Sequence, residues 1–148
     1  PDYSELFAEE KEMLAKLKKV FLMVAGSAIQ KYGVELNSHQ QLLMTAANIL
    51  NEVYMAESTL LRAEKNAKRF GEEAQAGQIA MAKLYLYNAV EIIAKNGKEG
   101  IISFAEGDEQ RMLLMGLKRF TKYANYPNVI ELRNFIAEKL KAENKYCF

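Results

Sequence analysis

The chain has 148 residues, half of them hydrophobic, with only two prolines and no tryptophan. Its 20 lysines and arginines nearly balance its 19 acidic residues, so no net field attracts a polyanion over long range, and we expect no nucleic-acid partner. Good helix formers dominate the composition, and a chain of this length buries enough surface for one core. These properties exclude a disordered chain and predict a single helical domain over residues 1–148.

The cysteine content and the chain's start bear on its compartment and boundaries. The only cysteine, Cys147, cannot form an internal disulfide, so we expect a reducing, cytoplasmic location. A membrane-spanning helix needs about twenty apolar residues, whereas the longest candidate, residues 20–29, is interrupted by Gly26 and Ser27. The chain starts at Pro1 without an initiator methionine or a signal peptide, which indicates either processing or a piece of a longer chain, and we expect the longer chain.

Two long helices are expected in the first half of the chain. Between residues 4 and 32 apolar positions recur three or four residues apart, and Gly33 ends the pattern. These positions are Leu14, Leu17, Phe21, Val24 and Ala28. Residues 37–41 contain a capping-box pattern for a second helix, which extends through a longer stripe over residues 42–67. That stripe consists of Leu42, Ala46, Ile49, Val53, Ala56, Leu60, Ala63 and Ala67.

A third long helix is expected to begin near Gly71. Its stripe consists of Ile79, Ala82, Leu86, Ala89 and Ile93. Gly97 and Gly100 could end it, but Ile101 and Phe104 still fall on the same face. Since a helix tolerates a glycine at about 1 kcal/mol, the spacing predicts continuation to Phe104.

Two shorter helices complete the predicted fold. Asp108 is a suitable N-cap for a helix over about residues 108–123, and Asn128 with Glu131 forms a capping box for another through about residue 143. No segment alternates with the period of two that is typical of a strand. The sequence therefore predicts an all-α antiparallel bundle of three long helices and two shorter ones.

The residues of the chain give little support for a catalytic site. A di-metal carboxylate centre needs two Glu-x-x-His pairs, yet His39 is the only histidine and has Leu36 three residues before it. The one histidine, at the start of a helix, gives no support for a nucleophilic triad, and Cys147 lies on the tail with no histidine or helix N-terminus nearby to activate it. No glycine-rich phosphate-binding loop occurs. We therefore assign no catalytic, cofactor-binding or metal-binding residue.

The charged clusters have a structural interpretation. The basic run over residues 65–69 could bind a phosphate, but the acids Glu72 and Glu73 follow directly and oppose its field. Glu57 and Glu64 lie beside the second helix's apolar stripe, where pairing with Arg62 or Lys65 is the simpler interpretation. Both features therefore indicate solvated helix faces.

The fourth predicted helix has more apolar residues than one core-facing stripe can absorb. They are Met112, Leu113, Leu114, Met115 and Leu117. The fifth helix, a second copy of the chain or another domain could cover them, because such a patch is unfavourable when bare. We take Met112, Leu113, Met115 and Leu117 as the candidate docking surface.

Four segments resemble the extreme C-terminus of bacterial acyl-CoA dehydrogenases, similar to the very-long-chain type. They are MVAGSAIQKYG (residues 23–33), AESTLLRAEK (residues 56–65), FAEGDEQRMLLMGLKRFTKY (residues 104–123) and the ending ENKYCF. The resemblance covers essentially the whole chain. It rests on helix-forming runs and not on chemical signatures.

The resemblance implies a parent enzyme that binds FAD, dehydrogenates the α and β carbons of a fatty acyl-CoA and passes electrons to an electron-transferring flavoprotein. The family's catalytic glutamate and flavin contacts belong to a preceding core, and no residue here matches them. This segment would then be a non-catalytic domain packed on the catalytic core of its own parent chain, where tetrameric members place a second dimer, so the parent is expected to be a homodimer.

Two alternatives from other functional classes remain. One is an independent helical module that binds a protein partner through its groove. The other is a helix bundle that lies on a membrane surface, as is attributed to this region in mitochondrial relatives. The balanced charge of the chain gives the membrane alternative little support.

Overall fold

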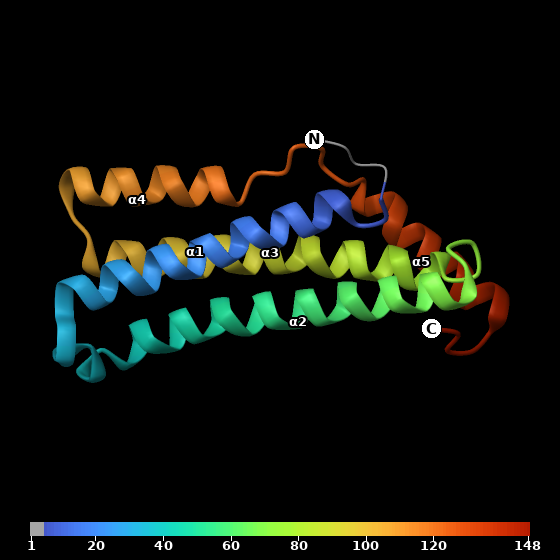
Figure 1. Cartoon of the computed structure of the whole chain (residues 1–148), viewed down its shortest axis with the longest axis horizontal. Helices are drawn as coiled ribbons and strands as arrows, with labels where there is room; N and C mark the ends of the chain where they lie inside the picture. The colour runs from blue at the N-terminus through green and yellow to red at the C-terminus, as the bar shows by residue number, and fades with distance from the viewer. Residues whose placement is uncertain (1–4) are drawn as a thin grey trace.

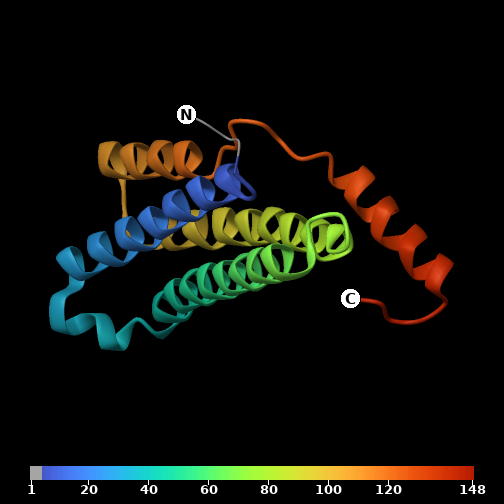
Figure 2. The same cartoon turned by 45° about the vertical axis from the view of Figure 1, so that its right-hand side comes forward.

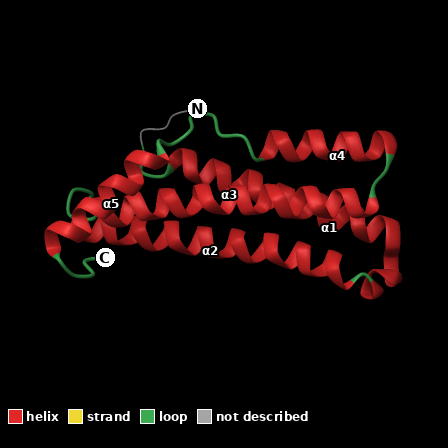
Figure 3. Cartoon of the chain, turned by 180° about the vertical axis from the view of Figure 1, so that it is seen from behind, coloured by secondary structure: helices red, strands yellow, loops and turns green. Residues whose placement is uncertain are grey.

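The computed structural model describes residues 5–148, which form five α-helices and one 3-10 helix. In chain order these are α1 (Ala8–Tyr32), η1 (Gly33–Ser38), α2 (Gln40–Phe70), α3 (Ala76–Phe104), α4 (Gly107–Phe120) and α5 (Val129–Glu143). Helices α1 to α4 run in alternating directions along the long axis (Figure 1). Seen from behind, the described chain consists of helices and loops without a strand (Figure 3). The predicted all-α antiparallel bundle is confirmed.

Helix α3 lies at the centre of the bundle and contacts each of the other four α-helices. Its neighbours α1 and α2 complete a three-helix core, α4 packs on α1 and α3, and α5 packs on α3. The largest fully buried side chains come mainly from these three long helices and include Leu17, Ile49, Leu60, Leu86 and Phe104. The predicted stripes form this core, with Phe21, Ala46 and Ile79 only partly buried.

Several helix ends agree with their sequence signals. Helix α1 stops at Gly33, whose φ of 53° is easily adopted only by glycine. At the start of α5 the Asn128 side chain accepts a hydrogen bond from the Glu131 backbone N–H, as the capping box predicts. Helix α3 ends at Phe104, so its predicted continuation is confirmed.

Other predicted ends are wrong by several residues. The capping signal at residues 37–41 does not cap α2, because residues 33–38 form η1 and no side chain caps the helix start. Helix α3 begins at Ala76, five residues later than predicted, after a turn. Asp108 lies inside the first turn of α4, whose N-cap is Glu106, and α4 ends at Phe120 instead of residue 123.

The two glycines near the end of α3 allow close helix packing. A Cβ on Gly97 would lie 2.7 Å from Cδ1 of Leu117 on α4. A Cβ on Gly100 would lie 3.3 Å from Cγ2 of Thr45 on α2. The helix therefore continues through both glycines, and their missing side chains provide the space in which neighbouring helices pack.

Helix α5 is attached differently from the others, because it contains no buried residue. It leans away from the bundle in Figure 2 and then leads into the chain's last residues, which turn back toward α3. There the Phe148 ring lies against Gly77 of α3, which has no room for a Cβ. The Lys139 ammonium lies 6.0 Å from the centroid of the same ring.

Candidate docking surface

The four candidate docking residues on α4 divide between two faces. Met112 and Met115 are 72% and 71% exposed, whereas Leu117 is buried against Gly97 and Leu113 packs partly against the core. Four residues spread over six helical positions cannot share one face at 3.6 residues per turn. The predicted four-residue surface is thus reduced to two exposed methionines.

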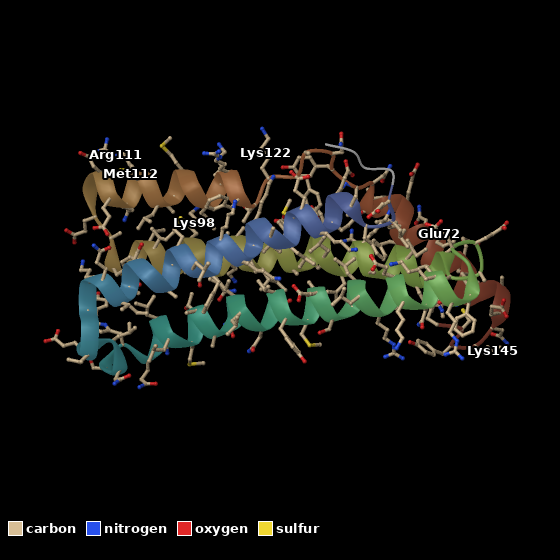
Figure 4. The ribbon with its side chains drawn as sticks, in the orientation of Figure 1. Glu72, Lys98, Arg111, Met112, Lys122 and Lys145 are labelled. Carbon is tan, nitrogen blue, oxygen red and sulfur yellow. The ribbon has the colours of Figure 1, made fainter. Side chains whose placement is uncertain are left out.

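The exposed face of α4 also has several basic residues, of which Arg111 is ion-paired with Asp108. Arg111, Lys118 and Arg119 are exposed beside the two methionines. Figure 4 shows Lys122, just past the helix end, projecting away from the bundle. The fifth helix does not cover this face, because α5 contacts α3 and not α4 among the described elements. Basic residues around two flexible apolar side chains are typical of a solvated helix face.

A more apolar surface lies along the seam between α1 and α2. Leu22 on α1 and Leu50 and Tyr54 on α2 are 66%, 48% and 70% exposed. With the more buried Phe21 and Val53 they line a hollow of about 370 Å³, which we call the α1–α2 groove. The hollow's remaining lining residues are Lys18 and Glu57.

Sequence reasoning missed the α1–α2 groove although a signal was present. Ile29 follows Leu22 by seven residues on α1, and Leu61 follows Tyr54 by seven on α2, which places each pair on one face. Both added residues are more than half exposed. Helices α1 and α2 thus each have a second apolar stripe beside the core stripe. A second stripe of this kind can be read from the spacing alone.

The acids beside the α2 stripe pair mainly across the seam, with lysines of α1, and Glu64 also pairs with Lys68 of its own helix. Glu57 forms an ion pair with Lys18 of α1, and Glu64 with Lys11 of α1. Lys68 lies 3.4 Å from the other oxygen of Glu64. The predicted partners, Arg62 and Lys65, are therefore wrong. The Lys11 hydrogen bond, with a smaller contribution from Lys68, holds the pKa of Glu64 below its usual value despite desolvation.

A second, smaller hollow, of about 160 Å³, lies between the start of α1 and the loop after α4. Its most buried member is Tyr123, whose ring centroid lies 6.3 Å from that of Tyr87 and 5.5 Å from that of Tyr126. Burial, followed by the nearby charge of Glu10, raises the pKa of the Tyr123 hydroxyl. A tyrosine that stays protonated in this way cannot serve as a general base.

His39 and Cys147, the only histidine and the only cysteine of the chain, lie in different parts of the structure. His39 precedes α2 and stacks on Tyr32, with ring centroids 3.8 Å apart, while Cys147 is a free, partly exposed thiol in the tail. Within residues 5–148 no three His, Cys, Asp and Glu side chains gather closely enough to hold a metal ion. Of the helices in that same range, none is both long and apolar enough to cross a membrane.

Comparison with known proteins identifies the family. A family profile described as "Acyl-CoA dehydrogenase, C-terminal domain" matches residues 16–119. A "Probable acyl-CoA dehydrogenase" of Bacillus subtilis (strain 168) is 33% identical over 143 residues, which are 97% of this chain and 24% of that protein. A crystal structure of an acyl-CoA dehydrogenase complexed with FAD from Bacillus anthracis matches 98% of this chain with a TM-score of 0.92 and 34% identity.

The matched region is a small part of each relative. The chain covers 25% of the B. anthracis protein and 24% of the B. subtilis one, so it spans about a quarter of the length of these relatives. The profile match runs from within α1 almost to the end of α4 and thus includes α2, α3 and most of α1. This chain belongs to the acyl-CoA dehydrogenase C-terminal domain family.

Proposed function

We propose that this chain is a non-catalytic packing domain of a longer, FAD-dependent acyl-CoA dehydrogenase. The parent enzyme would dehydrogenate the α and β carbons of a fatty acyl-CoA. The observation that supports this most directly is the close match of nearly the whole chain to about a quarter of an acyl-CoA dehydrogenase complexed with FAD. Fold alone does not establish function, so the absence of a suitable site in these residues also matters.

Two hollows among residues 5–148 have linings that do not suit a flavin. The hollow between the start of α1 and the end of α2, about 460 Å³ in volume, is lined by the ion-paired Lys11, Glu64 and Lys68. The α1–α2 groove is mainly aliphatic and aromatic, with its two charged residues already paired. Neither lining offers free donors for a pyrophosphate. We therefore assign FAD to another part of the parent chain and derive no reaction step here.

The domain's role would be architectural. It would pack on the catalytic core of its own chain, and the parent would be a cytoplasmic homodimer of the very-long-chain type. The B. subtilis and B. anthracis proteins are each about four times as long as the region matched here, which supports a covalently linked partner. A linked partner acts at a high effective concentration, so a modest interface suffices to keep the domain docked.

The upstream reading frame and the purified domain together test this proposal. We expect the frame to continue upstream of Pro1 into a flavin-binding core. The purified 148-residue chain should be colourless, without flavin absorbance, and should not dehydrogenate acyl-CoA substrates. A start codon close to Pro1, or a stoichiometric bound flavin in the isolated chain, contradicts the proposal.

An independent protein-interaction module is the second candidate, favoured by the exposed apolar residues of the α1–α2 groove. Apolar grooves between helices accept amphipathic helices of partner proteins. The two functions differ in whether the partner is encoded in the same reading frame. A short frame that encodes only this domain would favour the module.

A further inference from the structure

The seam between α1 and α2 has no helix over it among the described residues. Helix α4 packs on α1 and α3, and α5 packs on α3. Figure 1 shows α4 beside α1, on the side away from α2. Five large side chains along the uncovered seam are 48–70% exposed, namely Leu22, Ile29, Leu50, Tyr54 and Leu61. Three of them, Leu22, Leu50 and Tyr54, line one hollow, and exposed apolar residues gathered in this way often mark an interaction site.

The charges at the edge of the groove favour an apolar partner over a charged one. Lys18 pairs with Glu57, and farther along the seam Lys11 pairs with Glu64. These lysines and glutamates neutralise each other across the two helices, so a charged partner would gain little and would have to displace an existing pair. The outer face of α4, by contrast, has Lys118 and Arg119 exposed beside its methionines without an ion pair among residues 5–148, whereas Arg111 pairs with Asp108 at 2.7 Å.

The geometry points to a helix as the occupant. Two antiparallel helices with exposed residues at spacings of four and seven form ridges, and a third helix packs between such ridges. We propose that the α1–α2 groove holds the apolar face of a helix from the flavin-binding remainder of the same longer protein. This inference rests on the proposed function, and it moves the docking surface from α4 to the opposite side of α1.

The lengths of the relatives favour this occupant over a separate protein. The chain covers only 24% and 25% of two relatives that match nearly all of it, so three-quarters of each relative lies outside the matched region. Permanent interfaces within an assembly can be as apolar as a domain core, whereas transient ones are more polar. The largely apolar lining of the groove, with Phe21 and Val53 beneath Leu22 and Tyr54, is typical of the permanent class.

A pair of matched lysine substitutions tests the proposal in the full-length enzyme. Tyr54→Lys changes a groove residue that is 70% exposed, and Met112→Lys changes an α4 residue that is 72% exposed. In the isolated 148-residue chain both variants should melt at the wild-type temperature, because neither side chain is part of the core. In the full-length enzyme we expect Tyr54→Lys to speed protease release of this domain about tenfold or more, and Met112→Lys to leave it unchanged.

Four other outcomes contradict either the groove assignment or the proposed function on which it rests. Wild-type release rates for full-length Tyr54→Lys, or equal acceleration by both variants, would show that the groove is not the docked face. An isolated chain that is dimeric by light scattering, and that Tyr54→Lys makes monomeric, would identify a second copy as the occupant. If the upstream frame has no flavin-binding core, the proposed function itself fails. If the full-length protein is a flavoenzyme but Tyr54→Lys does not alter protease release of this domain, only the assignment of the groove as the docked face is refuted.

Discussion

Gly97 lies inside α3, and the space left by its missing side chain is filled by Leu117 of α4. An alanine in a helix interior is normally favoured over glycine by about 1 kcal/mol. At Gly97, however, the added methyl group would lie 2.7 Å from the buried Leu117 side chain. Sequence reasoning predicted correctly that the helix continues, but it could not predict that α4 uses the vacant space, because contacts between distant helices leave no local pattern.

We predict that Gly97→Ala lowers the free energy of unfolding by about 1–3 kcal/mol, since overpacking outweighs the gain in helix propensity. Gly26→Ala is the matched control, because Gly26 lies inside α1, is exposed and has no atom within 4 Å of the place where an added methyl group would lie. That control should raise stability by up to about 1 kcal/mol. Urea unfolding followed by circular dichroism measures both, and shifts of the same sign would contradict the packing role.

Glu64 connects a single side chain to the pH dependence of stability. Its pKa is held below the usual value by Lys11 and Lys68 in the folded protein, whereas in the unfolded chain it returns to about 4.3. A lowered folded-state pKa gives stabilisation that is present above the unfolded-state pKa and is lost as pH falls through the folded-state pKa. We predict that Glu64→Gln reduces this acid-induced loss.

The measurement is the melting temperature of wild type and Glu64→Gln at a series of pH values from neutral downward. The two curves should lie apart near neutral pH, with wild type the more stable, and should converge below about pH 4.3 as the carboxylate is protonated. Added salt should narrow the gap at neutral pH, because Lys11 and Lys68 are substantially exposed. Parallel curves over the whole range would exclude a contribution from this ion pair.

At the scale of helices, long periodic stripes were predictable and short connections were not. The α2 stripe was predicted over residues 42–67, and all its members except the half-buried Ala46 are buried. Gly33 is expected to end the first helix and residues 37–41 to cap the second, yet residues 33–38 fold as η1, whose i to i+3 hydrogen bonds produce no apolar periodicity in the sequence. Some predicted helix boundaries, which depend on the residues of a single turn, therefore differ from the observed ones by several residues. The existence of a helix, which depends on a pattern over several turns, is predicted correctly.

Helix α5 depends on the chain's last residues for its attachment. With no buried residue of its own, a helix of 15 residues is only marginally stable without further contacts. Contacts of Phe148 with Gly77 of α3 and with Lys139 of α5 provide such an anchor. We predict that Phe148→Ala speeds amide hydrogen exchange throughout α5 and leaves the buried amides of α1 to α3 protected.

Tyr146→Ala provides the comparison for this experiment. Tyr146 lies in the same tail and meets the Phe148 ring at a centroid distance of 6.0 Å, but it is 76% exposed. Its removal should change exchange in α5 much less than removal of Phe148. No effect of either substitution would mean that α5 is held by its own contacts with α3, and equal acceleration by both would mean that Phe148 is not the specific anchor.

At the scale of the whole molecule, the sequence predicted the helical bundle but not that its exposed apolar surface lies along the α1–α2 groove. The apolar excess of α4 suggested a docking surface there, because a local count cannot show which residues the bundle itself covers. Leu113 and Leu117 turned out to face inward, while Leu22 and Tyr54 were left exposed along another seam. Only the relative placement of α1, α2 and α4 distinguishes a core stripe from an uncovered one.

The basic face of α4 leads to a last prediction, about membranes. Each lysine or arginine near an anionic surface contributes about 1 kcal/mol to binding, and Lys118 and Arg119 lie together on that face. Asp108 and Glu109 in the first turn of the same helix oppose them, and the net charge of the chain is only +1. We therefore expect no sedimentation of the 148-residue chain with phosphatidylserine-containing vesicles at physiological salt, and weak sedimentation when the salt is lowered tenfold. Strong binding at physiological salt that Lys118→Glu abolishes would instead place α4 on a membrane surface.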